Sequence, residues 1–193
     1  MDTIVAKITN DSLTDKKIYE QAGKILREGG LVAFPTETVY GLGADALDEE
    51  ASAKIYAAKG RPSDNPLIVH IADIEALYKL SCEVPDKALK LADKFWPGPL
   101  TMILKKSDIV PDSITGGLGT VAIRMPSHKV AAELIRTSGV YIAAPSANTS
   151  GKPSPTRASH VIKDLSGKID MIIEDDTVDI GVESTIIDLS EEV

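Results

Sequence analysis

Apolar residues recur along the chain with two spacings, and segments with one spacing alternate with segments of the other. Apolar positions three or four residues apart predict amphipathic helices over 14–28, 48–59, 86–95, 127–139 and 156–165. Short apolar or alternating runs predict strands over 4–8, 31–34, 67–71, 100–104, 121–124, 141–144, 171–173 and 184–189. We therefore expect an α/β fold: a single domain over residues 1–193, with a mixed parallel and antiparallel sheet and flanking helices.

The stretch 29–45 places polar side chains directly after a buried strand. Its apolar run ends at Pro35, which cannot donate a hydrogen bond to a neighbouring strand. Four polar residues follow, Thr36, Glu37, Thr38 and Tyr40. Because ligands of open α/β sheets bind at the carboxyl ends of strands, this segment is a candidate site, although an ordinary loop would have the same residues. Gly41 and Gly43 would let the backbone turn tightly or approach a ligand.

Length and composition limit the classes of protein to which the chain can belong. The formal net charge of −8 over 193 residues argues against a broad nucleic-acid-binding surface, and the two Phe, one Trp and five Tyr offer little base stacking. A single cysteine excludes an internal disulfide, and three scattered histidines show no zinc-ligand spacing. Without a signal-peptide pattern or a membrane-spanning apolar segment, we expect a cytoplasmic protein with no membrane contact.

Cationic and small polar residues collect in two loops. Lys59 and Arg61 flank a glycine after a predicted helix, where cations favour the helix dipole, but the arginine fork also suits phosphate or carboxylate. Ser146 and Asn148 follow a buried strand, and such residues form either an ordinary turn or an anion-binding nest. No G-x-S-x-G sequence surrounds Ser146, so we do not expect a hydrolase nucleophile there.

Three more polar residues interrupt or border apolar strands. Arg124 ends the strand 121–124 and needs a partner, which an internal carboxylate or a ligand would supply equally well. His70 lies inside the strand 67–71, where a satisfied core histidine is the commoner case, and Ser184 opens the last strand. A cationic, polar cleft suited to a nucleotide and a small zwitterion would form if these residues met at one sheet edge: Thr36, Arg61, His70, Arg124, Ser146, Asn148 and Ser184.

Six segments together resemble the motifs of one known family. They are PTETVYGLGADA (35–46), KGRPSDNPLIVHI (59–71), WPGPLT (96–101), VAIRMP (121–126), APSAN (144–148) and GVESTIID (181–188). Over nearly its whole length, the chain resembles the YrdC-like domain of threonylcarbamoyl-AMP synthases. The resemblance implies a twisted mixed sheet with a deep cationic cavity. It also implies a reaction that joins L-threonine, bicarbonate or CO2, and ATP into threonylcarbamoyl-AMP and pyrophosphate, which partner enzymes use to modify an adenosine of tRNA.

The resemblance further implies roles for individual residues. Lys59 and Arg61 match a K-x-R motif and are expected to act in catalysis and to bind ATP. Further ATP contacts are expected from Asn65, Ser146, Asn148 and Ser154. Four residues are expected around threonine, with the arginine facing its carboxylate: Thr36, His70, Arg124 and Ser184. Thr115 and Thr120 flank a glycine-rich segment that would close over the site, and Mg2+ is expected to neutralise phosphate charge.

Two other functions stay open at this point. The same cavity would serve a module that binds double-stranded RNA or tRNA, a property described for YrdC-like proteins. A regulatory domain that keeps the pocket without turnover is the second alternative. The chain ends at Glu191-Glu192-Val193, whereas many relatives continue with an arginine-proline-glycine segment or a second domain, which indicates either a shortened chain or a dispensable tail.

Overall fold

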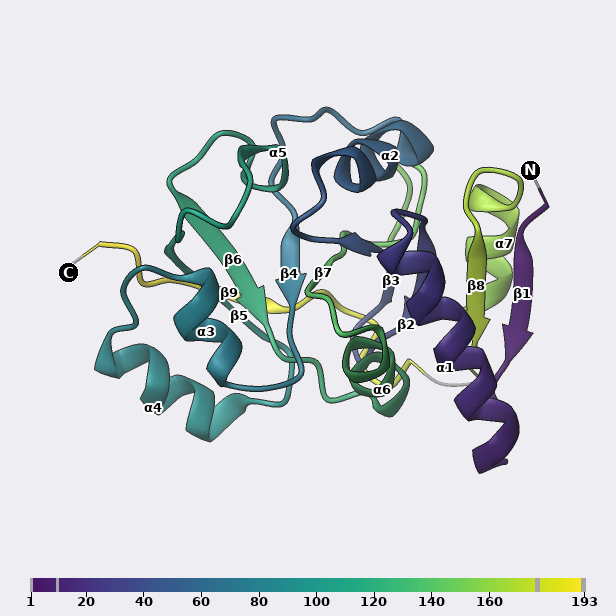
Figure 1. Cartoon of the computed structure of the whole chain (residues 1–193), viewed down its shortest axis with the longest axis horizontal. Coiled ribbons are helices and arrows are strands. Elements are labelled where there is room, and N and C mark those ends of the chain that lie inside the picture. The colour runs from purple at the N-terminus through teal and green to yellow at the C-terminus, as the bar shows by residue number, and fades with distance from the viewer. Residues whose placement is uncertain (1, 10, 176–177, 192–193) are drawn as a thin grey trace.

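The strands form the frame of the molecule in the computed structural model, which describes residues 2–9, 11–175 and 178–191 (Figure 1). The last two residues, 192–193, considered above with the end of the chain, lie outside the described part. The strands are β1 (Ile4–Lys7), β2 (Val32–Pro35), β3 (Tyr40–Asp45), β4 (Ile68–His70), β5 (Leu100–Lys105), β6 (Thr120–Arg124), β7 (Ile142–Ala143), β8 (Met171–Glu174) and β9 (Thr185–Asp188). The helices are α1 (Ser12–Arg27), α2 (Glu49–Lys59), α3 (Glu75–Leu80), α4 (Asp86–Phe95), α5 (Asp112–Thr115), α6 (Lys129–Ser138) and α7 (Ala158–Leu165).

The strands join into one sheet in the order β1-β8-β2-β3-β7-β4-β6-β5-β9. The pairs β1–β8, β8–β2, β4–β6 and β5–β9 are parallel. The pairs β2–β3, β3–β7, β7–β4 and β6–β5 are antiparallel. The predicted α/β class with a mixed sheet is therefore confirmed.

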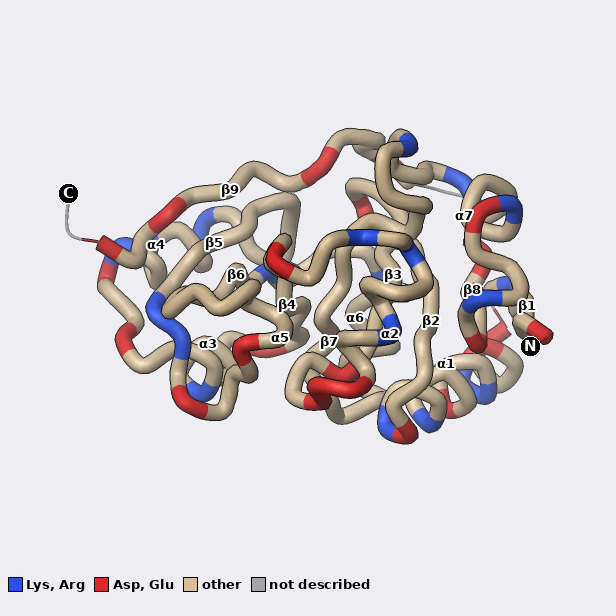
Figure 2. The backbone as a smooth tube through the Cα atoms, turned by 90° about the horizontal axis from the view of Figure 1, so that it is seen from above, with Lys and Arg blue, Asp and Glu red and all other residues tan. Residues whose placement is uncertain are grey.

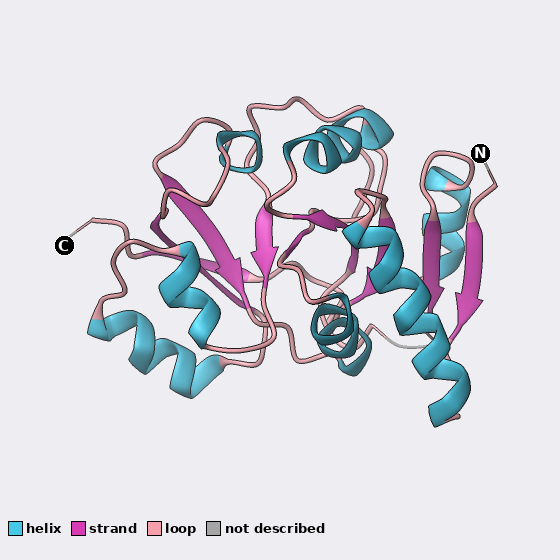
Figure 3. Ribbon diagram, in the orientation of Figure 1, coloured by secondary structure: helices cyan, strands magenta, loops and turns pink. Residues whose placement is uncertain are grey.

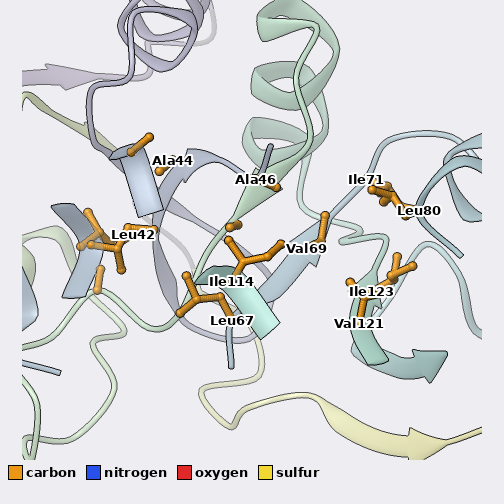
Figure 4. Close-up of a cluster of buried hydrophobic side chains, with 14 of the residues drawn as sticks. Leu42, Ala44, Ala46, Leu67, Val69, Ile71, Leu80, Ile114, Val121 and Ile123 are labelled. Atoms are coloured by element: carbon orange, nitrogen blue, oxygen red, sulfur yellow. The ribbon is translucent and has the colours of Figure 1, made fainter. Parts of the chain in front are cut away.

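Side chains alternate between the two faces of the sheet, and helices cover both faces (Figure 3). Val32 and Phe34 of β2 belong to an apolar cluster with α1 and α6. Leu31 and Ala33 belong to a second, larger cluster with α2, α3, α4, α5 and α7. Figure 4 shows part of this second cluster around Val69. The strands in the middle of the sheet are thus buried on both sides, which explains their continuous apolar runs.

Charged residues lie on the helices and loops and at the last position of several strands, among them Lys105 of β5 and Arg124 of β6, while β2 and β7 in the middle of the sheet carry none (Figure 2). Within the described residues, none of the helices combines the length and the apolar composition needed to span a bilayer.

The stretch 40–45 differs from its prediction, because it forms a strand instead of a glycine-rich loop. β3 pairs antiparallel with β2, and residues 36–39, three of them polar, make the connection between the two strands. Gly43 serves this pairing through close packing: an added Cβ would lie 2.8 Å from Phe34 Cε1 and 2.6 Å from Ile142 Cγ2. The glycine is therefore needed for the approach of neighbouring side chains within the sheet.

Two short helices, α3 and α5, were not predicted. They have six and four residues, which is too short for a helical apolar repeat to show in the sequence. Both contribute to the larger apolar cluster, through Leu77 and Leu80 in α3 and Ile114 in α5. Tertiary packing stabilises them where local propensity gives little signal.

Candidate functional site

One cavity collects polar side chains from five separate segments of the chain. Six of the ten predicted site residues lie on its wall: Thr36, Arg61, His70, Arg124, Ser146 and Ser184. Thr38 and Glu183 lie on the wall as well, without having been assigned to the site from the sequence. The remaining four predicted residues, Lys59, Asn65, Asn148 and Ser154, are not on the wall.

The sheet brings the wall residues together by strand register. His70 and Arg124 are the last residues of the parallel strands β4 and β6, and they are paired directly in register. Arg124 also lies opposite Thr101 on the antiparallel neighbour β5. The Thr101 hydroxyl lies 2.7 Å from the Ser184 hydroxyl, which fixes the segment before β9 at the same edge. The expected convergence at the carboxyl ends of strands is therefore present for these residues.

Arg124 has an internal partner and also faces the cavity. Its Nη2 lies 2.7 Å from Glu37 Oε1, and the two side chains are only 4% and 6% exposed. Burial alone would raise the pKa of Glu37, but the charge of Arg124 and its hydrogen bond outweigh burial and hold the pKa below its usual range. Glu37 is thus an anion that holds the guanidinium in place. The sequence left an ion pair and a ligand contact as alternatives, and the ion pair is present.

Two threonine hydroxyls extend this arrangement along the connection between β2 and β3. Arg124 Nη1 donates to Thr38 Oγ1 at 2.9 Å, and the hydroxyls of Thr38 and Thr36 lie 2.9 Å apart. Thr36 Oγ1 donates to the Val39 carbonyl at 2.7 Å. Because the Thr36 hydroxyl has a single hydrogen, Thr38 must donate to Thr36. The polar residues after β2 therefore form an ordered chain of hydrogen bonds that begins at the guanidinium.

His70 is a neutral imidazole on the cavity wall. Its Nδ1 lies 3.1 Å from the Ile68 carbonyl, and its ring packs edge-on against Phe34 with the centroids 6.3 Å apart. Burial, and secondly the charge of Arg124, lower the pKa of His70 to about 3. The side chain therefore adds polar atoms to the wall without a second positive charge beside Arg124.

The same pKa shift predicts that the protein loses stability in mild acid. Below about pH 6.5 the unfolded chain protonates His70, whereas the folded chain does so only near pH 3. The free energy of unfolding should therefore fall as the pH is lowered between these values, by up to about 1.4 kcal/mol per pH unit from this residue. Urea unfolding at pH 7 and pH 5 should show that the free energy of unfolding falls less in His70→Gln than in the unaltered protein. The same loss in both proteins would show that another group is responsible.

The two cations of the K-x-R motif occupy different surroundings. Arg61 lies on the cavity wall, where its Nη2 donates to the Pro66 carbonyl at 3.1 Å. Lys59, the last residue of α2, is only 1% exposed, and its Nζ donates to the carbonyls of Ser146 and Asn148. Burial, and secondly the charge of Arg61, lower the pKa of Lys59 to about 8. Lys59 therefore lies behind the loop that carries Ser146, and only Arg61 faces the cavity.

The other predicted nucleotide contacts lie around this loop. Asn148 is buried and its Nδ2 donates to the Lys152 carbonyl at 2.7 Å, so its amide holds the loop together. Ser154 Oγ donates to Glu183 Oε1 at 2.6 Å and lies next to the wall. Asn65 is exposed and directly precedes the wall residue Pro66, and its carbonyl accepts from the Tyr56 hydroxyl at 3.3 Å.

The glycine-rich segment after Thr115 does not reach the wall of the cavity. Thr115 is buried at the end of α5 and Thr120 begins β6. Gly116 has φ +62°, and a Cβ there would lie 2.5 Å from the Asp64 carbonyl oxygen. The segment therefore packs against the loop 60–66, which carries Arg61.

Thr38 and Glu183, which also lie on the wall, differ in whether the sequence indicated them. Thr38 lies inside the polar run after β2, so its position was visible, although its bond to Arg124 was not. Glu183 has the wrong charge for a cleft expected to be cationic, and its residue type gave no signal. The cavity combines two arginines with this carboxylate and several hydroxyls, which suits a ligand with both anionic and cationic groups.

Comparisons with known proteins match the chain along most of its length. Residues 24–193 match the family Sua5_yciO_yrdC, described as telomere recombination. The threonylcarbamoyl-AMP synthase of Pyrococcus abyssi is 59% identical over 189 residues, which cover 98% of this chain and 55% of the relative. The threonylcarbamoyl-AMP synthase of Bacillus subtilis is 55% identical over 187 residues, covering 96% of this chain and 54% of the relative. The chain thus spans about half the length of these curated relatives.

A solved structure also matches closely. The crystal structure of P. abyssi Sua5 complexed with L-threonine has a TM-score of 0.93 and 56% identity, and the match covers 99% of this chain and 55% of that chain.

Proposed function

The chain belongs to the Sua5/YciO/YrdC family, and on that premise we propose that it forms threonylcarbamoyl-AMP and pyrophosphate from L-threonine, CO2 or bicarbonate, and ATP. Relatives named threonylcarbamoyl-AMP synthase support this function at 59% and 55% identity. One observation carries the proposal: a guanidinium held by an internal carboxylate faces the same cavity as a second arginine. Such a cavity offers separate anion sites for an amino acid and for a nucleotide.

The threonine site lies around Arg124 in this proposal. Its guanidinium would pair with the substrate carboxylate, while the hydroxyls of Thr36 and Ser184 lie on the same wall. His70 is neutral, so it would not repel the substrate amine. A solved relative that contains L-threonine, at 56% identity, supports this assignment.

The nucleotide lies at the other end of the cavity in this proposal. Arg61 and Ser146 on the wall would contact ATP phosphates, since an arginine fork and small polar groups both bind phosphate oxygens. The residues expected at ATP from the sequence also include Lys59, Asn65, Asn148 and Ser154. Lys59 and Ser154 contact the wall residues Ser146 and Glu183, respectively, and Asn148 contacts Lys59.

The proposed reaction needs positioning and positive charge more than a dedicated base. The neutral threonine amine uses its lone pair to bond the carbon of CO2 and releases a proton to solvent water, which gives a carbamate. A carbamate oxygen then attacks the α-phosphorus of ATP, and the bond from that phosphorus to the bridging oxygen breaks with its electron pair on pyrophosphate. Fixed cations such as Arg61 would stabilise the charge that builds on phosphate oxygens.

Mg2+ enters the proposal as an ion carried by the nucleotide phosphates. Within the described part of the chain, no group of three or more His, Cys, Asp or Glu residues is placed to hold a metal. Mg2+ commonly combines phosphate oxygens with one or two carboxylates and waters. Glu183 on the cavity wall is an acidic residue that could supply one such ligand.

A labelling assay tests the proposed function. With 14C-threonine, bicarbonate and ATP, we expect a labelled conjugate with AMP and an equal amount of pyrophosphate, and neither product when bicarbonate or ATP is omitted. Partner enzymes that transfer the threonylcarbamoyl group to tRNA belong to the same proposal. No conjugate, together with salt-sensitive binding of double-stranded RNA, would instead support an RNA-binding module.

A further inference from the structure

The Lys59 ammonium is enclosed by the loop that it supports. It donates to the main-chain carbonyl of Ser146, to that of Asn148 at 2.6 Å, and to Asn148 Oδ1 at 3.4 Å. A lysine ammonium has three donors, and these three contacts use all of them. Since the residue is only 1% exposed, the ammonium has little opportunity to exchange these partners for water.

Arg61, two residues further along, retains free donor capacity at the cavity. Its Nη2 donates to the Pro66 carbonyl, and its buried Nε has no hydrogen-bond partner among the described residues. A guanidinium carries five N–H donors, so most of them remain for a ligand. The two cations of the motif therefore differ: one is satisfied by backbone and the other is open toward the cavity.

The lysine fixes peptide groups whose opposite ends are also fixed. In the peptide between Ser146 and Ala147, the carbonyl accepts from Lys59 and the amide of Ala147 donates to the Tyr40 carbonyl at 2.8 Å. In the peptide after Asn148, the carbonyl accepts from Lys59 and the amide of Thr149 donates to Asp164 Oδ2 at 3.3 Å. Because a peptide group is planar, anchoring both ends sets its orientation.

The Lys59 backbone holds the same loop from a second point, since the amide of Ser150 donates to the Lys59 carbonyl at 2.9 Å. The end of α2 therefore contacts the loop at Ser146, Asn148 and Ser150. Without the ammonium, two buried carbonyls would lose a charged donor, and the peptide groups after Ser146 and Asn148 would be held from their amide ends alone.

We propose that Lys59 is a positioning residue: its ammonium holds the 146–148 loop in its binding conformation before any nucleotide arrives, and Arg61 is the cation of the motif that touches phosphate. The inference rests on the proposed function for its nucleotide, but the state of the loop is a property of the unliganded protein. A site whose groups are held in advance binds and reacts without reorganisation.

Hydrogen–deuterium exchange of the unliganded protein tests this inference. In Lys59→Met, which keeps an unbranched stem and removes the ammonium with its donors, the amides of Ala147 and Ser150 should exchange roughly 10- to 100-fold faster. Lys59→Arg should restore part of the protection. The matched control is Lys54→Met, because exposed Lys54 of the same helix also donates to a carbonyl, that of Gly29 at 2.6 Å, away from the loop. Lys59→Gln serves the same purpose if Lys59→Met does not fold.

Ligand binding supplies the second measurement. We expect Lys59→Met to weaken binding of a non-hydrolysable ATP analogue about tenfold or more, with threonine affinity changed less than about twofold. Unchanged hydrogen exchange of the loop in Lys59→Met would overturn the proposal, whatever happens to nucleotide affinity. A fall in nucleotide affinity with unchanged exchange would show that the ammonium touches phosphate directly. If even the unaltered protein binds no nucleotide, the proposed function fails while the exchange result still decides the role of Lys59 in the loop.

Discussion

Arg124→Met should lower the free energy of unfolding by about 3–5 kcal/mol, which is the usual cost of leaving a buried charge without its partner. Glu37 is only 6% exposed, and the guanidinium of Arg124 is what holds its pKa below the usual range. Without that guanidinium, burial favours the protonated acid, and Thr38 loses its charged donor. Urea unfolding at pH 7 measures this loss.

A double variant separates the stability of the ion pair from its role in binding. Glu37→Met combined with Arg124→Met replaces both charges by apolar side chains, and should recover most of the lost stability. Threonine affinity should not recover, because the substrate carboxylate still lacks a cation worth about 1.5–3 kcal/mol. If the free energy of unfolding of Arg124→Met falls by less than about 1 kcal/mol, water in the cavity solvates the Glu37 carboxylate in place of the guanidinium, and the prediction is wrong.

Arg61→Ala should reduce turnover by roughly 100- to 1,000-fold, comparable with the loss of a positioned donor from an oxyanion hole. The expected cause is the loss of the cavity-facing cation of the K-x-R motif, whose side chain donates to the Pro66 carbonyl and leaves its Nε without a partner in the described part of the chain. Because few contacts within the fold depend on this side chain, the free energy of unfolding should change little. The labelled-threonine assay under saturating substrates measures the turnover.

Two further variants sharpen the test of Arg61. Arg61→Lys keeps a charge but not the planar fork. Turnover of Arg61→Lys between that of Arg61→Ala and that of the unaltered protein would therefore indicate bidentate phosphate contact. Arg136→Ala is the matched control, since Arg136 is exposed and its ion pair with Glu133 at 2.9 Å lies on the surface of α6. Full activity in Arg61→Ala would remove the residue from the proposed nucleotide site.

Local patterns in the sequence were sufficient for the class of fold and for most of its elements. Apolar runs located strands β2, β4, β5, β6 and β8, because strands buried on both faces are apolar throughout. The polar residues at the ends of these strands could be identified as a candidate site because ligands bind at that edge of such sheets. Thr36, His70 and Arg124 were found in this way, and the cavity confirms that they lie together.

Pairings between distant segments were decided only by the tertiary structure. Arg124 and Thr38 are 86 positions apart, and Lys59 and Ser146 are 87 positions apart, so no local pattern indicates either contact. The motif resemblance gave Lys59 and Arg61 the same expected role, whereas packing encloses Lys59 in backbone carbonyls and leaves Arg61 on the cavity wall. Residue types and their spacing specify which groups are available near a strand end, but burial and the choice of partner arise only when separate elements pack together.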